Sequence, residues 1–229
     1  FEPKWLLTPA PAGSYRSIFR WGDPAFFKYP KESLYKMMKE AFHMTDEDFR
    51  DYTDDIGFDQ VSLPDHPSRI APEHLEALKK IVGKEFVTTG DYERLSVAYG
   101  CTGYDLLRLR HKQIDSLPDV VVYPDTTEQV EELVHYAAEH KLPLYVYGGG
   151  SSVTRGVEPI KGGISLDMRK RFNKILSFNE VDQTITVQAG LSGPALEEAL
   201  QDAPNRFGAK RQYTCGHFPQ SFEYSSVGG

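Results

Sequence analysis

The segment from Pro118 to Tyr147 places the tightest constraint on the fold of this chain. PDVVVYP is a short β-branched run between prolines, which is typical of a buried strand. Thr126 or Thr127 can cap the helix that follows, and Gln129 comes three residues after Thr126 as in a capping box. LPLYVY then predicts a second strand, so the unit is strand–helix–strand and its two strands are parallel. Apolar residues recur at helical spacing between the two strands: Val130, Leu133, Val134 and Ala137.

The pattern changes after this unit. GGISLDM, ILSFN and TITVQAG each predict a strand, and the turn at residues 180–182 joins the last two as a hairpin. Ser192 can cap a helix through ALEEAL, after which the chain returns to loop chemistry. Residues 116–229 therefore predict an α+β domain with a parallel start and an antiparallel continuation. Because EYSSVGG ends with no element after it, we expect this domain to be truncated at its carboxy end.

Residues 1–115 predict a mainly helical amino-terminal region. Leu34, Met37, Met38 and Phe42 fall at helical spacing within residues 31–42. Thr45 precedes acidic residues as a helix cap would, and Pro72 stands early in a helix over residues 71–82. Two further segments are compatible with helices: residues 91–100 and 104–110.

Charge and cysteine content narrow the classes of partner and compartment. A net charge of −7 argues against nucleic acid, and no apolar stretch reaches membrane-spanning length. Cys101 and Cys215 are too few for a disulfide scaffold or a Cys-rich zinc site, which favours a reducing intracellular compartment. His135 and His140 are five residues apart and HExxH is missing from the sequence, so we predict no metal site.

Three consecutive glycines, Gly148 to Gly150, follow the second predicted strand and precede Ser151 and Ser152. Backbone N–H groups can converge on a phosphate where no Cβ atom obstructs them. The loop is not a Walker A motif, because no Lys-Ser/Thr follows, and its spacing is not GxGxxG. From these residues alone, a structural turn and a phosphate-binding loop explain the glycines equally well.

The order of the motifs resembles the FAD-binding domain of the vanillyl-alcohol oxidase and p-cresol methylhydroxylase (PCMH-type) superfamily. VVVYP, the capped helix, LPLYVYGGGSSV, ISLDM, the hairpin ending in QAG, and GHFPQSFEYSSVGG occur in that family's order. RSIFRWGDPAFF, VTTGDYERLSVAYGCTGYDLLRLR and the tail resemble the alkyldihydroxyacetonephosphate synthase family. The resemblance implies an incomplete PCMH-type FAD-binding domain at residues 116–229, after the helical region.

The resemblance also implies two FAD-binding segments. The glycine loop would hold the pyrophosphate, and the tail would run along the flavin and ribityl side. Gln220 stands where the synthases have Asp, and a neutral amide can still donate and accept hydrogen bonds. Gly150 stands where some superfamily members carry a histidine that is covalently bonded to the flavin, so non-covalent FAD is predicted. The implied cofactor-binding residues are Val146, Tyr147, Gly148, Gly149, Gly150, Ser151, Ser152, Val153, Pro219, Gln220, Ser221, Phe222, Glu223, Tyr224, Ser225 and Ser226.

His217 is the candidate catalytic residue, because a neutral imidazole near the second segment could donate to a flavin or substrate oxygen. A hydrogen-bonded loop histidine is the alternative. Cys215 is interpreted as a small buried residue rather than a nucleophile. Arg108 and Arg110, with His111, could bind a substrate phosphate, although cations on a helix surface are the commoner explanation.

The implied activity is exchange of an acyl for an alkyl group on dihydroxyacetone phosphate in ether-lipid synthesis, through a flavin N5 adduct. The alternatives are an FAD-dependent dehydrogenase of a small 2-hydroxy acid and a fragment without activity. The amino-terminal region favours the synthase, and we expect residues 1–229 alone to be inactive. The implied partners are a small-molecule or lipid-derived substrate and the remaining carboxy-terminal part of the protein, and the resemblance leaves open a homodimer and a peripheral membrane contact. The compartment would be the cytoplasm in a bacterium and the peroxisome in a eukaryote.

Overall fold

The computed structural model describes residues 10–18, 32–49 and 56–228. The chain divides into two compact units. One unit comprises residues 1–61 and 106–113, and the other comprises residues 62–105 and 114–229. The second unit therefore holds the whole region with the predicted FAD-binding segments, together with residues 62–105. RSIFRWGDPAFF lies largely outside the described residues.

The smaller unit contains the helices α1 (Tyr15–Ile18) and α2 (Glu32–Phe42) and most of α5 (Gly103–Arg110). Helix α2 confirms the helix expected over residues 31–42. The helix expected at Thr45 is a turn over residues 46–49, because Thr45 and Asp48 bond each other's backbone N–H and close the segment locally. Arg108 is 1% exposed, so the interpretation as a helix-surface cation is wrong for this residue.

The larger unit is built on a four-stranded sheet with the order β1-β2-β4-β3. Strands β2 (Val120–Val122) and β3 (Leu144–Tyr147) both run parallel to β4 (Ile164–Asp167), which lies between them. The predicted parallel orientation of the first two strands is confirmed, although they are not neighbours. Strand β1 (Val87–Thr88) pairs antiparallel with β2 at the edge.

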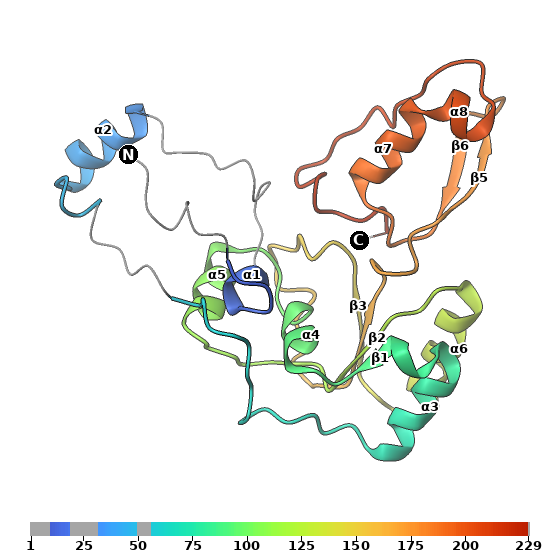
Figure 1. Ribbon diagram of the computed structural model, residues 1–229, viewed down its shortest axis with the longest axis horizontal. Coiled ribbons are helices and arrows are strands. Elements are labelled where there is room, and N and C mark those ends of the chain that lie inside the picture. The colour runs from blue at the N-terminus through green and yellow to red at the C-terminus, as the bar shows by residue number, and fades with distance from the viewer. Residues whose placement is uncertain (1–9, 19–31, 50–55, 229) are drawn as a thin grey trace. The chain divides into compact units, whose positions relative to one another are not determined.

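Helices cover both faces of this sheet (Figure 1). Helices α3 (Pro72–Val82) and α6 (Thr127–Glu139) pack against one face, and α4 (Asp91–Ser96) packs against the other. Successive side chains of a strand point to opposite faces, so Val120 and Val122 join the α3–α6 core while Val121 packs with Val97. Leu78 and Leu133 are fully buried in that core, and burial of each stabilises the fold by about 1.5–3 kcal/mol.

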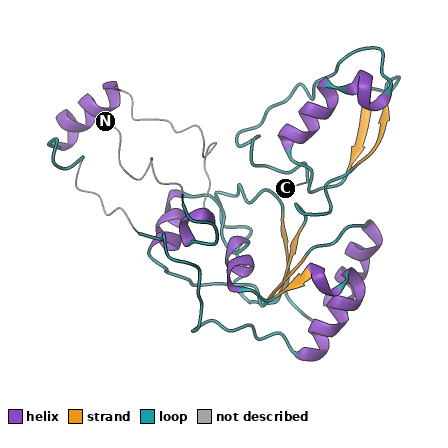
Figure 2. Ribbon diagram, in the orientation of Figure 1, coloured by secondary structure: helices purple, strands orange, loops and turns teal. Residues whose placement is uncertain are grey.

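The remaining elements follow the sheet as a hairpin and two helices (Figure 2). Strands β5 (Ile175–Asn179) and β6 (Thr184–Val187) pair antiparallel, as expected, in a separate two-stranded sheet. Phe178 stacks on Phe207, with ring centroids 4.9 Å apart, so the hairpin is covered by α8 (Ala203–Phe207). Helix α7 (Gly193–Gln201) begins after Ser192, whose hydroxyl accepts from the N–H of Ala195, which confirms the predicted cap.

Of the two residues predicted as possible caps, Thr126 caps the helix, because its hydroxyl accepts from the N–H of Gln129 at 3.2 Å. We expect Thr126→Ala to lower the free energy of unfolding by about 1 kcal/mol, since the substitution leaves an N-terminal N–H of α6 without its partner. Urea unfolding followed by circular dichroism measures this. Thr127→Ala is the matched control, because Thr127 is exposed and is not the capping residue. Equal losses in the two variants would contradict the role of the cap.

Candidate cofactor site

The glycine loop begins at the carboxyl end of β3, and hydrogen bonds to residues 99–101 hold it in place. Cys101 donates its N–H to the carbonyl of Ser152 at 2.8 Å, and the hydroxyl of Tyr147 donates to the carbonyl of Tyr99 at 3.3 Å. Burial raises the pKa of Tyr147 to about 12, so its hydroxyl stays protonated and keeps donating at neutral pH. Gly150 has a φ of 70°, which favours glycine at this position.

The second predicted segment meets this loop directly. A Cβ atom on Gly149 would overlap the carbonyl oxygen of Tyr224 and approach the Cα of Ser225 to 2.8 Å. The hydroxyls of Ser151 and Ser225 are 3.0 Å apart, within hydrogen-bonding distance. The structure therefore brings together two segments that are about 70 residues apart in the sequence.

The second segment is itself held by the start of α7. Gly193 donates its N–H to the carbonyl of Ser225 at 3.2 Å, and Val227 donates to the carbonyl of Leu191 at 2.8 Å. A tight turn precedes this contact, in which Tyr224 donates to the carbonyl of Ser221 at 2.8 Å. The tail is thus paired with residues 189–193, which sequence reasoning assigned only to a strand end and a cap.

A cavity of about 180 Å³ lies at this junction. Its lining comes from the glycine loop, the segment after β4, the start of α7 and the tail: Gly149, Arg169, Asn173, Gly190, Leu191, Ser192, Ala195, Tyr224 and Ser226. Ser226 is 6% exposed, and its hydroxyl has no hydrogen-bond partner among the described residues. An unsatisfied buried hydroxyl costs free energy, so a ligand that bonds to it would restore the loss. Hydroxyls, glycine backbone, a helix N-terminus and an arginine fit a phosphate-bearing group such as the pyrophosphate of FAD.

The predicted cofactor-binding residues differ in how far they are available to a ligand. Gly148, Gly149, Ser151 and Ser152 are half-buried in the loop, and Gly150 and Tyr147 are buried. Val146 and Val153 are exposed at the two ends of this segment. In the second segment, Pro219, Gln220 and Glu223 are exposed, Ser226 is buried, and Ser221, Phe222, Tyr224 and Ser225 are half-buried.

His217 and Cys215 lie on the approach to the second segment. His217 is exposed, and its catalytic role stays a prediction. Cys215 is half-buried rather than buried, and its thiol donates to Oε2 of Glu197 at 3.2 Å. Burial and this carboxylate raise the pKa of the thiol, while the N–H of Cys215 lowers the pKa of Glu197 to about 2. A thiol whose pKa is raised is a poor nucleophile, in agreement with its interpretation.

Six residues that line the cavity were not predicted to bind the cofactor: Arg169, Asn173, Gly190, Leu191, Ser192 and Ala195. One signal could have found Arg169. The carboxyl ends of parallel strands meet at one edge of a sheet, and ligands bind outside that edge. Arg169 comes two residues after the end of β4, so it was placed to meet the glycine loop that follows β3.

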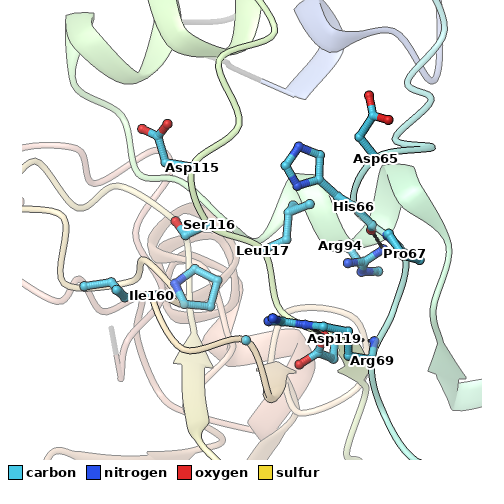
Figure 3. Close-up of a pocket in the computed structure, with 12 residues that line it drawn as sticks. Asp65, His66, Pro67, Arg69, Arg94, Asp115, Ser116, Leu117, Asp119 and Ile160 are labelled. Atoms are coloured by element: carbon cyan, nitrogen blue, oxygen red, sulfur yellow. Dashed lines mark hydrogen bonds and ion pairs between the residues drawn. The ribbon is translucent and has the colours of Figure 1, made fainter.

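A second cavity, of about 290 Å³, lies at the opposite ends of the strands and is lined by charged groups (Figure 3). The buried charged groups among them, Arg94 and Asp119, are bonded within the protein. Arg94 is 2% exposed, and it donates to the carbonyls of Pro118 and His66, each at 2.8 Å. Asp119 accepts from Gly163 and Arg69. These bonds tie residues 66–69 to the start of β2, which indicates a structural role for this cavity.

Comparison with known proteins identifies the domain that holds the glycine loop and the tail. Residues 118–229 match the family described as the FAD binding domain. The chain is 32% identical over 166 residues to alkyldihydroxyacetonephosphate synthase of Dictyostelium discoideum, covering 71% of this chain and 26% of that protein. A solved structure of an alkyldihydroxyacetonephosphate synthase has a TM-score of 0.65 and 32% identity, covering 71% of this chain and 28% of the other. A mitochondrial D-lactate dehydrogenase (cytochrome) of Saccharomyces cerevisiae is 28% identical over 136 residues, covering 58% of this chain and 23% of that protein.

The chain spans about a quarter of the length of these relatives. The match and the superposition confirm the α+β fold class, the PCMH-type FAD-binding domain and FAD as the cofactor. The relatives that share this domain are named as enzymes, both a synthase and a dehydrogenase. Residues 118–229, about half of this chain, therefore form a domain of the kind described as the FAD binding domain.

Proposed function

We propose that this chain is the FAD-binding part of a flavoenzyme like alkyldihydroxyacetonephosphate synthase, which exchanges an acyl for an alkyl group on dihydroxyacetone phosphate. The observation that carries the proposal is the convergence of the glycine loop and the tail on one cavity. The similarity to the synthase supports the proposal. The alignment with the synthase covers more of the chain, and at higher identity, than the alignment with the dehydrogenase.

Under this proposal, residues of the site bind the phosphates, orient the rest of the cofactor or hold the glycine loop in place. The backbone of Gly148 to Gly150 and the hydroxyls of Ser151 and Ser226 bind the phosphates, and the tail orients the rest of the cofactor. The hydrogen bond from the hydroxyl of Tyr147 to the carbonyl of Tyr99 holds the loop in place. FAD, when bound, supplies the electron-accepting ring system. His217 is proposed to donate a hydrogen bond to a cofactor or substrate oxygen, since its exposed side chain is free to turn towards either.

Further partners belong to the same proposal. The proposed partners are a small-molecule or lipid-derived substrate, the remaining part of the polypeptide and a second copy of the chain. A peripheral contact with a membrane is proposed as well. Among the described residues, no helix is long and apolar enough to cross a bilayer. Cys101 and Cys215 are free thiols, which supports a reducing intracellular compartment.

The experiment that tests the reaction uses the full-length protein with bound FAD. Acyl-dihydroxyacetone phosphate and a labelled fatty alcohol should yield a labelled ether lipid, with no net change in the flavin absorbance. A small 2-hydroxy acid added without oxygen should leave that absorbance unchanged. Bleaching by the hydroxy acid, with no ether product, would instead identify a dehydrogenase, the alternative that the similarity to D-lactate dehydrogenase favours.

FAD is proposed to be bound without a covalent link to this loop. A Cβ atom on Gly150 would overlap the hydroxyl of Tyr147, and the φ of 70° is strained for other residues. We therefore expect the flavin absorbance near 450 nm to stay in the supernatant when the holoprotein is precipitated with acid. A yellow pellet that survives washing would contradict non-covalent binding. Protein precipitated after addition of free FAD is the control for trapped flavin.

A further inference from the structure

We infer that Arg169 is a binding residue for the pyrophosphate of FAD, an assignment that rests on the proposed function. Arg169 is the only charged side chain that lines the cavity between the glycine loop and the tail, within the part of the chain that the structure describes. Its side chain is 40% exposed, so the guanidinium reaches the solvent-accessible space of the cavity. An arginine keeps its positive charge at every physiological pH.

The guanidinium is held in one orientation from two sides. Its Nε and Nη2 donate to the two carboxylate oxygens of Asp167, at 2.9 and 2.6 Å. The side chain of Asp167 is only 3% exposed, so this fork is anchored in the protein interior. The guanidinium carbon also lies 4.7 Å from the ring centroid of Tyr147, in a cation–π contact. Tyr147 and Asp167 are paired across strands β3 and β4, which makes the support part of the sheet.

This arrangement leaves one end of the guanidinium for a ligand. Nη1 of Arg169 has no hydrogen-bond partner among the described residues, and it carries two N–H donors. Guanidinium groups bind phosphate oxygens with charge-assisted hydrogen bonds that are about twice as strong as neutral ones. Because Asp167 already fixes the side chain, little rotamer entropy is lost when the ligand binds.

The neighbours of Arg169 in the cavity select the same ligand chemistry. Gly149 presents backbone from the glycine loop, and Ser226 presents a buried hydroxyl without a partner. Ser192 and Ala195 lie at the first turn of α7, where the helix dipole favours negative charge. The glycine loop, the tail and the start of α7 thus supply donors and positive potential to the cavity, and no acidic side chain is part of its described lining. The pyrophosphate anion meets these donors better than the neutral flavin ring or ribityl chain.

The test compares variants at two adjacent cations, with the apoprotein of each titrated with FAD. We expect Arg169→Gln to raise the Kd for FAD about 10-fold to 30-fold, measured by quenching of flavin fluorescence. Lys170→Gln removes the same charge next to it from an exposed side chain that does not line the cavity, so its Kd should stay within about twofold of the wild type. Equal weakening in both variants, or none in a folded Arg169→Gln, would overturn the assignment.

A second variant deals with the buried carboxylate that Arg169→Gln leaves unpaired. In Asp167→Asn/Arg169→Gln no charge remains at the pair, so this protein should fold even where the single variant does not, and it should show the same loss of affinity. A folded double variant with wild-type affinity would overturn the inference. Thermal unfolding of the apoprotein reports folding independently of the cofactor.

ADP and riboflavin separate the two halves of the ligand. In Arg169→Gln, the Kd for ADP, measured by displacement of FAD, should rise by the same factor as the Kd for FAD. The Kd for riboflavin, measured in the same way, should be equal in Arg169→Gln and the wild type. An unchanged Kd for ADP would place the contact on the flavin side and refute the assignment to the pyrophosphate. A wild-type protein that binds no FAD at all would refute the proposed function itself, which is a different outcome.

Discussion

Gly149→Ala is expected to weaken FAD binding by at least about 100-fold, which corresponds to about 2.7 kcal/mol. The added Cβ would overlap the carbonyl oxygen of Tyr224, and backbone atoms cannot turn aside as a flexible side chain can. The glycine loop and the tail must then separate. Because both line the same cavity, their separation removes donors from two sides of the cofactor at once. Titration of the apoprotein with FAD, followed by flavin fluorescence, measures the loss.

Gly156→Ala is the matched control for this prediction. Gly156 is exposed in the same connection between β3 and β4, and a Cβ atom there would have no heavy atom within 4 Å. Its affinity for FAD should match that of the wild type, because alanine and glycine differ there only in the unfolded chain. If both variants bind FAD equally well, the close approach of loop and tail does not govern the site.

The parts of the fold that could be predicted are those with a local cause. The strand at 120–122, the helix that Thr126 caps and the hairpin at 175–187 follow from β-branched runs, apolar spacing and turn residues, and each was found. The insertion of β4 between β2 and β3 was not predicted, because strand order depends on contacts between residues that are distant in sequence. Helix α8 was missed because APNRF is short and contains Pro204, which reads as a breaker.

The site divides in the same way between local and non-local causes. The glycine loop is visible in the sequence because a phosphate-binding loop needs consecutive residues without Cβ atoms. Its contact with Ser225 depends on how β4, the hairpin and α7 fold back, and no period or spacing encodes that distance. Arg169 shows how far prediction from the sequence reaches. In the sequence it is one of three consecutive basic residues, and only the folded sheet shows that it lines the same cavity as Gly149.

The largest loss of stability is expected at Asp119, outside the cofactor cavity. Asp119 is 8% exposed, and its carboxylate accepts from the N–H of Gly163 at 2.6 Å and from the N–H of Arg69 at 3.0 Å. Its own backbone N–H donates to the carbonyl of Gly163 at 2.7 Å, so this residue joins the starts of β2 and β4. We expect Asp119→Ala to lower the free energy of unfolding by about 2–4 kcal/mol, because it leaves a buried N–H without an acceptor and removes an anchor for residues 68–69.

Urea unfolding of the apoprotein measures this loss without interference from the cofactor, and an unchanged slope with urea would show that the denatured state is unaffected. Asp65→Ala is the control, because Asp65 lines the same cavity but is exposed, and it should change stability by less than about 0.5 kcal/mol. The loss of unfolding free energy in Asp119→Asn should lie between the losses in Asp119→Ala and Asp65→Ala. The amide oxygen of Asn can still accept from the N–H of Gly163, whereas its NH₂ group cannot accept from the N–H of Arg69. Should Asp119→Ala prove as stable as Asp65→Ala, the carboxylate does not join the strands, and the second cavity would need another explanation for its buried charge.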